Sequence, residues 1–288
     1  MKLLVYGAGV LGSLFSTRMH EAGHDVSLLA RGERLNALRR HGVQLAEGGS
    51  PAIRRVPVPV VEHPTGRYDL IAVFVRTHQV EAVLETLTDV EGDVLFMLNW
   101  AAGAEPLGAV IGHERVLLGF PTAAGTMDGD VVRYRATNII TRLFPTPIGE
   151  PDGRATPRLK RIVREFRAAG INAKAEPQMD AWLKTHAAFE VPILQAVNAA
   201  GGPVALANDP DTIRGMIRLM RQNLTALPTP LVPRGFVALQ TLPEGLLLAM
   251  LRRFLRSPTA AQLDGPSPAA RAELERLAEQ IRVHTRVW

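Results

Sequence analysis

Three glycines near the start of the chain are spaced in a way that lets a phosphate approach the backbone. Gly7, Gly9 and Gly12 form the pattern G-x-G-x-x-G, which directly follows the apolar run at residues 2–6. In this pattern the first glycine permits a tight turn, the second admits a pyrophosphate, and the third lets the next helix pack closely on the strand. The phosphate oxygens then meet free N–H groups at the start of a helix.

We therefore expect a dinucleotide-binding turn, and a tight strand-to-helix turn without a ligand is the alternative. The residues of the expected turn are Gly7, Ala8, Gly9, Val10, Leu11 and Gly12.

The residue after the second expected strand indicates which dinucleotide this turn would hold. Proteins that bind NAD usually have Asp or Glu there, on the ribose hydroxyls. Here the apolar run at residues 26–30 is followed by Arg31. Because an arginine suits a 2′-phosphate, the sequence predicts NADP(H). Glu33 follows two residues later, and a shift in register would restore NAD.

Lysine is rare in this chain, so each lysine is a candidate for a task that arginine cannot perform. Of the 33 basic residues four are lysines, which leaves 29 arginines. The four are Lys2, Lys160, Lys174 and Lys184. Arginine stays protonated, whereas a lysine can release a proton when its surroundings lower its pKa. Lys2 starts an expected strand, and Lys160 and Lys174 lie among other charges, so Lys184 is the candidate of interest.

The first half of the chain alternates apolar runs with helical patterns, which predicts a doubly wound, Rossmann-type α/β sheet. The expected strands lie at residues 2–7, 25–30, 69–75 and 93–98, and the expected helices at 10–23, 32–42 and 77–88. Residues 43–61 contain several prolines and are expected to form irregular edge strands. Residues 115–120, 131–136 and 138–150 are expected to add strands that extend the sheet, and 154–170 to form an amphipathic helix closed by Gly170.

After about residue 172 the patterns predict helices and no strand. The expected helices lie at residues 181–200, 209–227, 243–255 and 267–283. Three of them begin at favourable pairs, Asp209-Pro210, Pro243-Glu244 and Ser267-Pro268. We therefore expect an NADP-binding Rossmann-like domain at 1–172 and an all-α substrate or dimerisation domain at 173–288.

These residues resemble the ketopantoate reductase (2-dehydropantoate 2-reductase) family. The resemblance lies in GAGVLGSLFSTRMHEAGHDVSLLARGERLNAL, AVFVRTHQVEAVL, the Asn99 segment and DAWLKTHAAF, and it covers residues 1–200 best. It implies a Rossmann domain followed by a helical domain, with the site in the cleft between them. It also implies reduction of a 2-oxo acid by NADPH, which in this family serves pantothenate biosynthesis.

The resemblance assigns further cofactor residues. Arg31 matches the family's cofactor pattern, as do the three glycines. Arg76 stands where the family usually has a lysine near the cofactor, after the third strand of the expected sheet. Asn99 matches the asparagine of the family's Q-N-G, but Trp100 replaces the glycine. A turn-forming asparagine is the alternative explanation of Asn99.

The resemblance also assigns residues that would act on or contact the substrate. Lys184 matches the catalytic lysine of K-x-x-x-N, while Ala188 occupies the asparagine position. Glu273 corresponds to the family's later glutamate. The family's serine falls near residues 260–261, which are alanines, and Asp264 keeps an acidic position.

Lys184 is then expected to act as the general acid, donating a proton to the carbonyl oxygen; a surface lysine with a buried stem is the alternative. Glu273 would orient Lys184 or bind a substrate hydroxyl, unless it merely belongs to a charged surface helix. Gln195 and Asn198 share a helical stripe with Lys184 and could supply amides, although they more simply satisfy nearby backbone. His186 is a weaker candidate acid on another helical face.

The composition excludes several other classes. The chain has no cysteine, so disulfides and thiol chemistry are excluded. The histidines lack metal-ligand spacing, so no metal is expected. No apolar run reaches the length of a membrane span and the N-terminus lacks a secretory signal, so we expect a cytoplasmic protein. The net charge of +5 is scattered in isolated arginine pairs, which argues against nucleic acid. Whether a homodimer completes the C-terminal domain is left open.

Three functional hypotheses follow. The first is NADPH-dependent reduction of a small, ketopantoate-like 2-oxo acid. The second is reduction of a bulkier or more apolar carbonyl compound, because polar substrate contacts such as the asparagine at position 188 are missing. The third is an NADP(H)-binding sensor without turnover. NADPH oxidation against a panel of 2-oxo acids distinguishes them.

Overall fold

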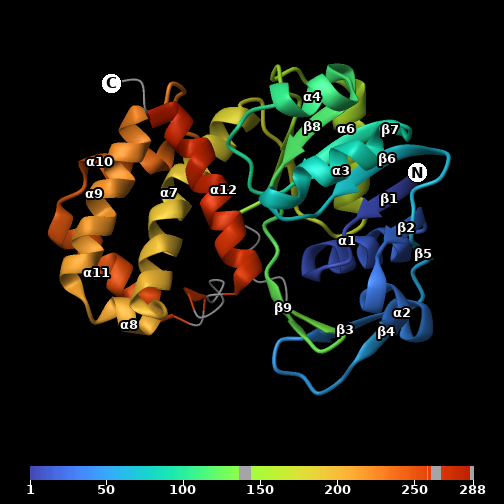
Figure 1. The fold of residues 1–288 in the computed structure, drawn as a ribbon, viewed down its shortest axis with the longest axis horizontal. Coiled ribbons are helices and arrows are strands. Elements are labelled where there is room, and N and C mark those ends of the chain that lie inside the picture. The colour runs from blue at the N-terminus through green and yellow to red at the C-terminus, as the bar shows by residue number, and fades with distance from the viewer. Residues whose placement is uncertain (136–143, 258, 261–266, 286–288) are drawn as a thin grey trace. The chain divides into compact units, whose positions relative to one another are not determined.

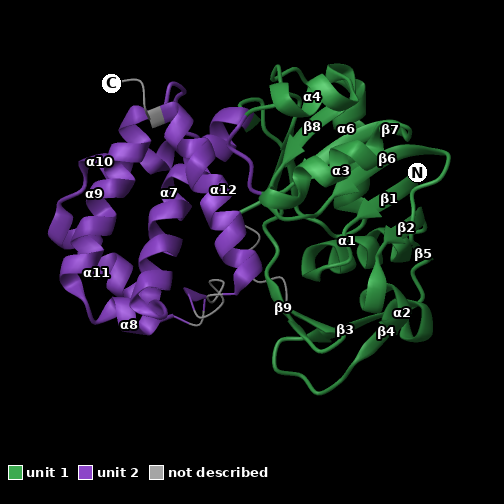
Figure 2. Cartoon of the chain, in the orientation of Figure 1, with its two compact units in different colours: residues 1–98, 103–179 green, residues 99–102, 180–288 purple. Residues whose placement is uncertain are grey.

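The chain divides into two compact units in the computed structural model, which describes residues 1–135, 144–257, 259–260 and 267–285. Unit 1 comprises residues 1–98 and 103–179, and unit 2 comprises residues 99–102 and 180–288 (Figure 2). The boundary expected between residues 172 and 173 lies just before a short strand, β12, that belongs to unit 1.

Unit 1 is built on an eight-stranded sheet. In spatial order its strands are β12 (Ala173–Ala175), β11 (Thr146–Gly149), β8 (Val116–Gly119), β7 (Glu91–Met97), β6 (Arg67–Val73), β1 (Lys2–Tyr6), β2 (Asp25–Leu29) and β5 (Val60–Val61). The six strands from β8 to β5 pair in parallel, and β11 is antiparallel to β8. Their order is that of a Rossmann fold, with the topological switch between β1 and β6. The α/β prediction is therefore confirmed.

The helices of unit 1 connect these strands (Figure 1). They are α1 (Val10–Glu21), α2 (Gly32–His41), α3 (Val80–Leu87), α4 (Glu105–Ile111) and α6 (Pro157–Ala168), with short 3₁₀ turns at Thr77–Gln79 and His113–Arg115. Helix α6 begins where Thr156 Oγ1 accepts a hydrogen bond from the Leu159 amide at 3.2 Å. It ends before Gly170, whose φ of +74° suits glycine, as the sequence predicted.

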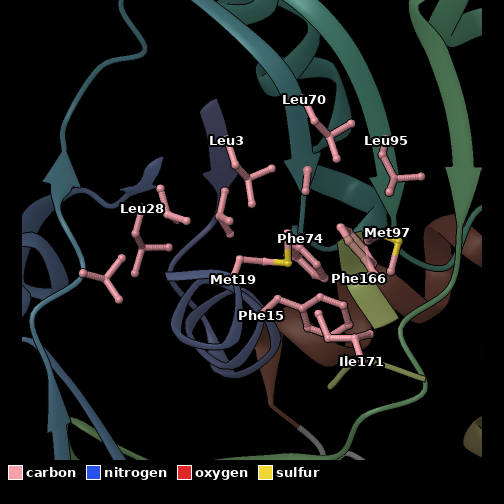
Figure 3. Close-up of a cluster of buried hydrophobic side chains, with 14 of the residues drawn as sticks. Leu3, Phe15, Met19, Leu28, Leu70, Phe74, Leu95, Met97, Phe166 and Ile171 are labelled. Carbon is pink, nitrogen blue, oxygen red and sulfur yellow. The ribbon is translucent and has the colours of Figure 1, made fainter. Parts of the chain in front are cut away.

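Alternate residues of the strands pack against α1 and α6 and form the main core of unit 1. On β1, Leu3 and Val5 join this cluster, as do the corresponding positions of β2, β6 and β7. Figure 3 shows Phe15 of α1 near Phe74, which follows β6, and Phe166 of α6. The ring centroids of Phe74 and Phe166 lie 4.7 and 6.0 Å from that of Phe15. The intervening residues face the other side of the sheet and are buried as well. Burial on both faces explains why these strands read as continuous apolar runs.

A second sheet corrects the prediction that residues 131–136 extend the first one. Its strands are, in order, β4 (Arg54–Val56), β3 (Val43–Glu47), β10 (Val131–Tyr134) and β9 (Gly125–Asp128). Strand β10 pairs in parallel with β3, so two segments far apart in sequence form this sheet. Helix α1 contacts strands of both sheets, which is why it is buried on nearly every side and has no polar face.

Two other expectations need correction. Strand β12 lies beyond residue 172, where no strand was expected, and it pairs in parallel with β11. Within the expected strand at 138–150, β11 covers Thr146–Gly149, while residues 138–143 lie outside the described part of the chain. A strand of three residues such as β12 is too short to produce a recognisable pattern.

Unit 2 consists of residues 99–102 and a set of helices. These are α7 (Met179–Ala200), α8 (Pro203–Ala207), α9 (Pro210–Ala226), α10 (Val237–Thr241), α11 (Glu244–Leu255) and α12 (Pro268–Thr285), with a 3₁₀ turn at Arg234–Phe236. The predicted helix starts are confirmed: Asp209 Oδ1 accepts from the Thr212 amide at 3.0 Å, and Ser267 Oγ accepts from the Ala270 amide at 3.1 Å. None of the helices in the described ranges combines the length and the apolar character needed to cross a lipid bilayer.

Helix α7 runs through the core of unit 2 and continues past Pro192. Its buried Ala188 and Val191 pack in one cluster with apolar residues of α9, α11 and α12. The segment 99–102 is held to α12, because the Ala101 amide donates to Gln280 Oε1 at 2.8 Å and His284 Nε2 lies 2.8 Å from Ala101 O.

The core of unit 1 makes a testable prediction about stability. Phe166 is 1% exposed and Phe144 is 63% exposed. Phe166→Ala should lower the free energy of unfolding by about 3–5 kcal/mol, since it leaves a cavity beside Phe15. The matched control Phe144→Ala should change it by less than about 0.5 kcal/mol. Denaturant unfolding measures both, and equal losses in the two variants would contradict this account of the core.

Candidate active site

The three glycines of the first turn have different reasons to be glycine. A Cβ at Gly7, whose φ is +108°, would lie 2.4 Å from Phe74 O, and a Cβ at Gly12 would lie 1.8 Å from Gly7 O. The fold itself therefore requires these two glycines. Gly9 has an ordinary φ of −72°, and a Cβ there would meet no described atom within 4 Å. The open space beside Gly9 is what a ligand approaching the backbone needs.

The Ala8 carbonyl of this turn accepts two hydrogen bonds, and the amides that follow Gly9 belong to the first turn of α1. Ala8 O accepts from Ser13 Oγ at 3.2 Å and from Arg34 Nε at 3.1 Å. Gly9 is the N-cap of α1 and offers no side chain to its first amides. These amides and the positive end of the helix dipole form an anion-binding arrangement.

Arg34 also contributes to this turn, although it was not among the residues predicted for the site. Besides Ala8 O, its guanidinium donates to Ser13 Oγ at 3.2 Å and to Asp130 O at 3.0 Å. It therefore joins the glycine turn to the loop between β9 and β10. Burial lowers the pKa of Arg34, although Asp130 opposes the shift. The sequence does indicate that Arg34 lies close to Arg31, because it follows Arg31 by three residues and so belongs to the first turn of α2.

Arg31 lies at the carboxyl end of β2, as predicted, and its side chain is held by the last residue of β1. Its Nη2 donates to Tyr6 Oη at 2.9 Å, and its guanidinium carbon is 5.9 Å from the centre of the Tyr6 ring. Tyr6 Oη in turn donates to Thr86 Oγ1 at 3.3 Å. Arg31 itself remains exposed, so its other N–H groups can reach a ligand at this edge of the sheet.

Arg76 and Asn99 follow the next two parallel strands. Arg76 comes shortly after β6, is half-buried and is the N-cap of the 3₁₀ turn at Thr77–Gln79. Asn99 comes shortly after β7 and belongs to unit 2. The carboxyl ends of parallel strands share one edge of a sheet, where ligands bind in folds of this type.

Lys184 lies on α7 and is 9% exposed. Its Nζ donates to Asp180 Oδ2 at 2.6 Å, one helical turn earlier. Burial with a paired carboxylate argues against the alternative of a surface lysine. The i, i+4 spacing of Asp180 and Lys184 is readable from the sequence, but Asp180 was not among the predicted site residues.

The remaining candidates on the substrate side are dispersed. Glu273 lies half-buried on α12, and the carboxylate that pairs with Lys184 is that of Asp180. Gln195 is exposed on the far part of α7, while Asn198 Oδ1 is buried without a hydrogen-bond partner among the described residues. Ala260 is fully buried, and Asp264 lies outside the described residues.

A second polar stripe on α7 consists of Trp182, His186 and Glu190, each one turn apart. The Trp182 and His186 rings stack with centroids 5.1 Å apart and planes 14° apart. His186 Nε2 lies 3.5 Å from Glu190 Oε2, and the same oxygen accepts from Asn99 Nδ2 at 2.8 Å. Burial tends to raise the pKa of Glu190, but the neighbouring His186 and the hydrogen bond from Asn99 lower the pKa below its ordinary value.

The described part of the chain contains no group of three or more His, Asp or Glu side chains arranged to hold a metal ion.

Comparison with known proteins places this arrangement in a family. The model of the family described as ketopantoate reductase PanE/ApbA matches residues 3–143. The 2-dehydropantoate 2-reductases of Mesorhizobium japonicum and Archaeoglobus fulgidus are 23% and 28% identical to this chain over 212 and 205 residues. The chain is therefore distantly similar to the ketopantoate reductase family, most clearly over residues 3–143. The matched regions cover 64% and 70% of this chain and 63% of each relative's length.

Solved structures agree with this chain in fold. D-mandelate dehydrogenase in complex with NADH and anilino(oxo)acetate has a TM-score of 0.70 at 16% identity, covering 99% of both chains. The 2-dehydropantoate 2-reductase of Porphyromonas gingivalis has a TM-score of 0.65 at 17% identity, covering 98% of this chain and 99% of the other. At such identities the likeness concerns the fold: a Rossmann-like sheet followed by helices.

The glycine turn predicts opposite effects of two similar substitutions on stability. Gly12→Ala should lower the free energy of unfolding by at least about 3 kcal/mol, because the new methyl group overlaps the Gly7 carbonyl. Gly9→Ala should change it by less than about 1 kcal/mol, and in the stabilising direction, because it restricts the unfolded chain. Thermal unfolding without ligand measures both, and a Gly9→Ala variant as unstable as Gly12→Ala would show that the space beside Gly9 is filled.

Proposed function

We propose that this chain is an NADPH-dependent reductase that converts a small 2-oxo acid into the 2-hydroxy acid, with Lys184 as the general acid. The observation that carries the proposal is the glycine turn. Gly7 and Gly12 are needed by the fold, whereas Gly9 keeps open a space that the protein does not use. This space lies beside the uncapped start of α1, at the switch point of the sheet.

The residues at this edge of unit 1 fit a phosphorylated dinucleotide. The backbone of residues 7–12 would hold the pyrophosphate, and Arg31 would hold the 2′-phosphate. Arg76 and Asn99 would contribute further contacts to the cofactor. NADH in the structure of D-mandelate dehydrogenase supports a nicotinamide cofactor for this fold, and the arginine after β2 favours its phosphorylated form.

Reduction of a ketone requires a hydride for the carbonyl carbon and a proton for the carbonyl oxygen. When bound, the nicotinamide supplies the hydride. Lys184 Nζ holds the proton: one N–H is directed to Asp180, and the others can bind the carbonyl oxygen and stabilise the charge that develops there. The Lys184 ammonium also attracts the substrate carboxylate. Asp180 holds the ammonium in place, and Glu273 is proposed to bind a substrate hydroxyl.

The proposed substrate class is based on the substrates of the relatives and on one position at which this chain differs from the family. The relatives act on 2-dehydropantoate, and the D-mandelate dehydrogenase structure contains anilino(oxo)acetate. Position 188, where the family has an amide, is an alanine that is fully buried. This loss of a polar contact favours a 2-oxo acid with a more apolar side chain than ketopantoate.

Ala188 also favours the second candidate, an NADP(H)-binding sensor without turnover. NADPH oxidation against 2-oxo acids of increasing side-chain size separates the two. Turnover with at least one member of the panel supports the reductase, and NADPH binding without turnover of any member supports the sensor.

Lys184 makes the sharpest prediction about the mechanism. Lys184→Ala should lower kcat by about 10²–10⁴-fold and leave the affinity for NADPH nearly unchanged. Lys184→Arg should be almost as slow, since it keeps the charge but does not release a proton readily. The matched control is Lys174→Ala, an exposed position on β12, which should behave as wild type. Wild-type rates in Lys184→Ala would remove this residue from the mechanism.

Arg31 makes a prediction about cofactor choice. Loss of hydrogen bonds between a guanidinium and a phosphate costs about 1.5–3 kcal/mol. Arg31→Ala should therefore weaken NADPH binding roughly 10–100-fold while leaving NADH binding nearly unchanged. Fluorescence titration with both dinucleotides tests this, with Arg39→Ala at the other end of α2 as the control. Tighter binding of NADH than NADPH by the unmodified chain would contradict the assignment.

A further inference from the structure

A tyrosine at the end of β1 contacts the arginine that is proposed to bind the 2′-phosphate. Arg31 Nη2 donates a hydrogen bond to Tyr6 Oη at 2.9 Å, although the two residues are 25 positions apart. Tyr6 pairs in register with Leu29, the last residue of β2, and Arg31 follows Leu29 by two residues. Both Tyr6 and Arg31 belong to unit 1. The contact therefore lies within one compact unit, where β1 leads into the glycine turn.

The Tyr6 hydroxyl belongs to a chain of hydrogen bonds whose direction is set by the backbone of α3. Thr86 Oγ1 donates to Ala82 O at 3.0 Å, and a carbonyl oxygen can only accept. The Thr86 oxygen therefore accepts the proton of the Tyr6 hydroxyl, at 3.3 Å. Because this hydroxyl has a single proton, its oxygen is left to accept from another donor. The guanidinium of Arg31, which has only donors, is bound there.

Tyr6 is fixed in place, whereas the Arg31 side chain extends into solvent. Tyr6 is 5% exposed, and β1 pairs with a parallel strand on each side. The backbone of Arg31 is held as the N-cap of α2, but its side chain is exposed and has many rotamers to lose on ordering. The bond to Tyr6 fixes the guanidinium end of this side chain. It uses one of the five N–H groups of a guanidinium, so a phosphate can bind to others.

We propose that Tyr6 is a positioning residue that favours the phosphorylated dinucleotide: its hydroxyl, directed by Thr86, holds the Arg31 guanidinium in the orientation that binds the 2′-phosphate. The inference rests on the proposed function, in which Arg31 binds this phosphate. An arginine that is already ordered loses less conformational entropy when the phosphate binds. NADH has a hydroxyl at the 2′ position and lacks the charge that the guanidinium would bind. The effect of Tyr6 is therefore confined to NADPH.

The test measures the dissociation constants of NADPH and NADH for Tyr6→Phe, which removes the hydroxyl and keeps the ring. Ordering a long side chain on binding costs the equivalent of about 2–10-fold in affinity. Tyr6→Phe should therefore weaken NADPH binding about 2–10-fold and leave NADH binding nearly unchanged. A variant that folds poorly would lose affinity for both dinucleotides, so the ratio of the two constants separates positioning from general stability.

Two further comparisons test whether Tyr6 acts through the proposed chain of hydrogen bonds. Thr86→Val removes the acceptor of the Tyr6 hydroxyl and should shift the ratio in the same direction, while Thr86→Ser keeps a hydroxyl and should retain the wild-type ratio. In the Arg31→Ala background, Tyr6→Phe should have no further effect on NADPH binding, because no guanidinium is left to position.

Tyr68→Phe is the matched control in the same sheet. Tyr68 lies on β6 and is 3% exposed. Its Oη accepts from the Thr65 amide at 3.3 Å, and the Lys2 ammonium lies 5.2 Å from the centre of its ring. Tyr68 thus resembles Tyr6 in burial and in its contacts with donors, but the cation beside it is not Arg31. Tyr68→Phe should leave the ratio of NADPH to NADH affinity unchanged.

The outcomes separate this inference from the proposed function. An unchanged ratio in Tyr6→Phe, or losses that add to those of Arg31→Ala, would overturn the role of Tyr6. Tighter NADPH binding by Tyr6→Phe would also overturn it, by showing that the hydroxyl holds Arg31 away from the phosphate. An unchanged ratio in Thr86→Val would overturn the part assigned to Thr86. A wild-type chain that binds no NADPH, or binds NADH as tightly, would instead overturn the cofactor assignment of the proposed function.

Discussion

The arrangement of unit 1 depends on close backbone contacts at Gly7 and Gly12, which a side chain at either residue would prevent. The Gly7 carbonyl occupies the space into which a Cβ on residue 12 would project, and the Phe74 carbonyl occupies the corresponding space at residue 7. These contacts bring the start of α1 down onto the ends of β1 and β6. The same helix then packs against the second sheet on its other side, and Arg34 bonds both the turn and the loop between β9 and β10. The position of the amides at the start of α1 is thus set by the packing of two sheets and not by the loop alone.

Helix α7 has a comparable role in unit 2, because it carries two separate polar stripes. Asp180 and Lys184 lie one turn apart on one stripe, and His186 and Glu190 lie one turn apart on the other. Residues two positions apart lie on nearly opposite faces of a helix, so the two pairs serve different partners. In the proposed function the first pair performs proton transfer, and in the second pair the Glu190 carboxylate accepts a hydrogen bond from Asn99. The apolar residues between the stripes bury the helix among α9, α11 and α12.

Much of this fold could be predicted from the sequence, because its signals are local. Buried parallel strands are continuous apolar runs, and helix starts such as Asp209-Pro210 and Ser267-Pro268 depend on neighbouring residues. The second sheet could not be predicted, since its parallel pairing of β10 with β3 joins segments that share no local pattern. The residues of the candidate site likewise divide into those that the sequence can predict and those that it cannot. The glycines and Arg31 are recognised by spacing from a strand, and Asp180 could have been recognised by its spacing from Lys184. The contact between Glu190 and Asn99 has no such signal, because it depends on how α7 packs against the segment 99–102.

A crystal structure of this protein grown with millimolar NADPH would show whether the glycine turn holds the dinucleotide. We expect pyrophosphate oxygens within hydrogen-bond distance of the backbone amides that follow Gly9, with the 2′-phosphate on the Arg31 guanidinium. A dinucleotide bound elsewhere on the chain, or a glycine turn that stays empty while crystals of a known NADPH-dependent reductase soaked in parallel are filled, would contradict it.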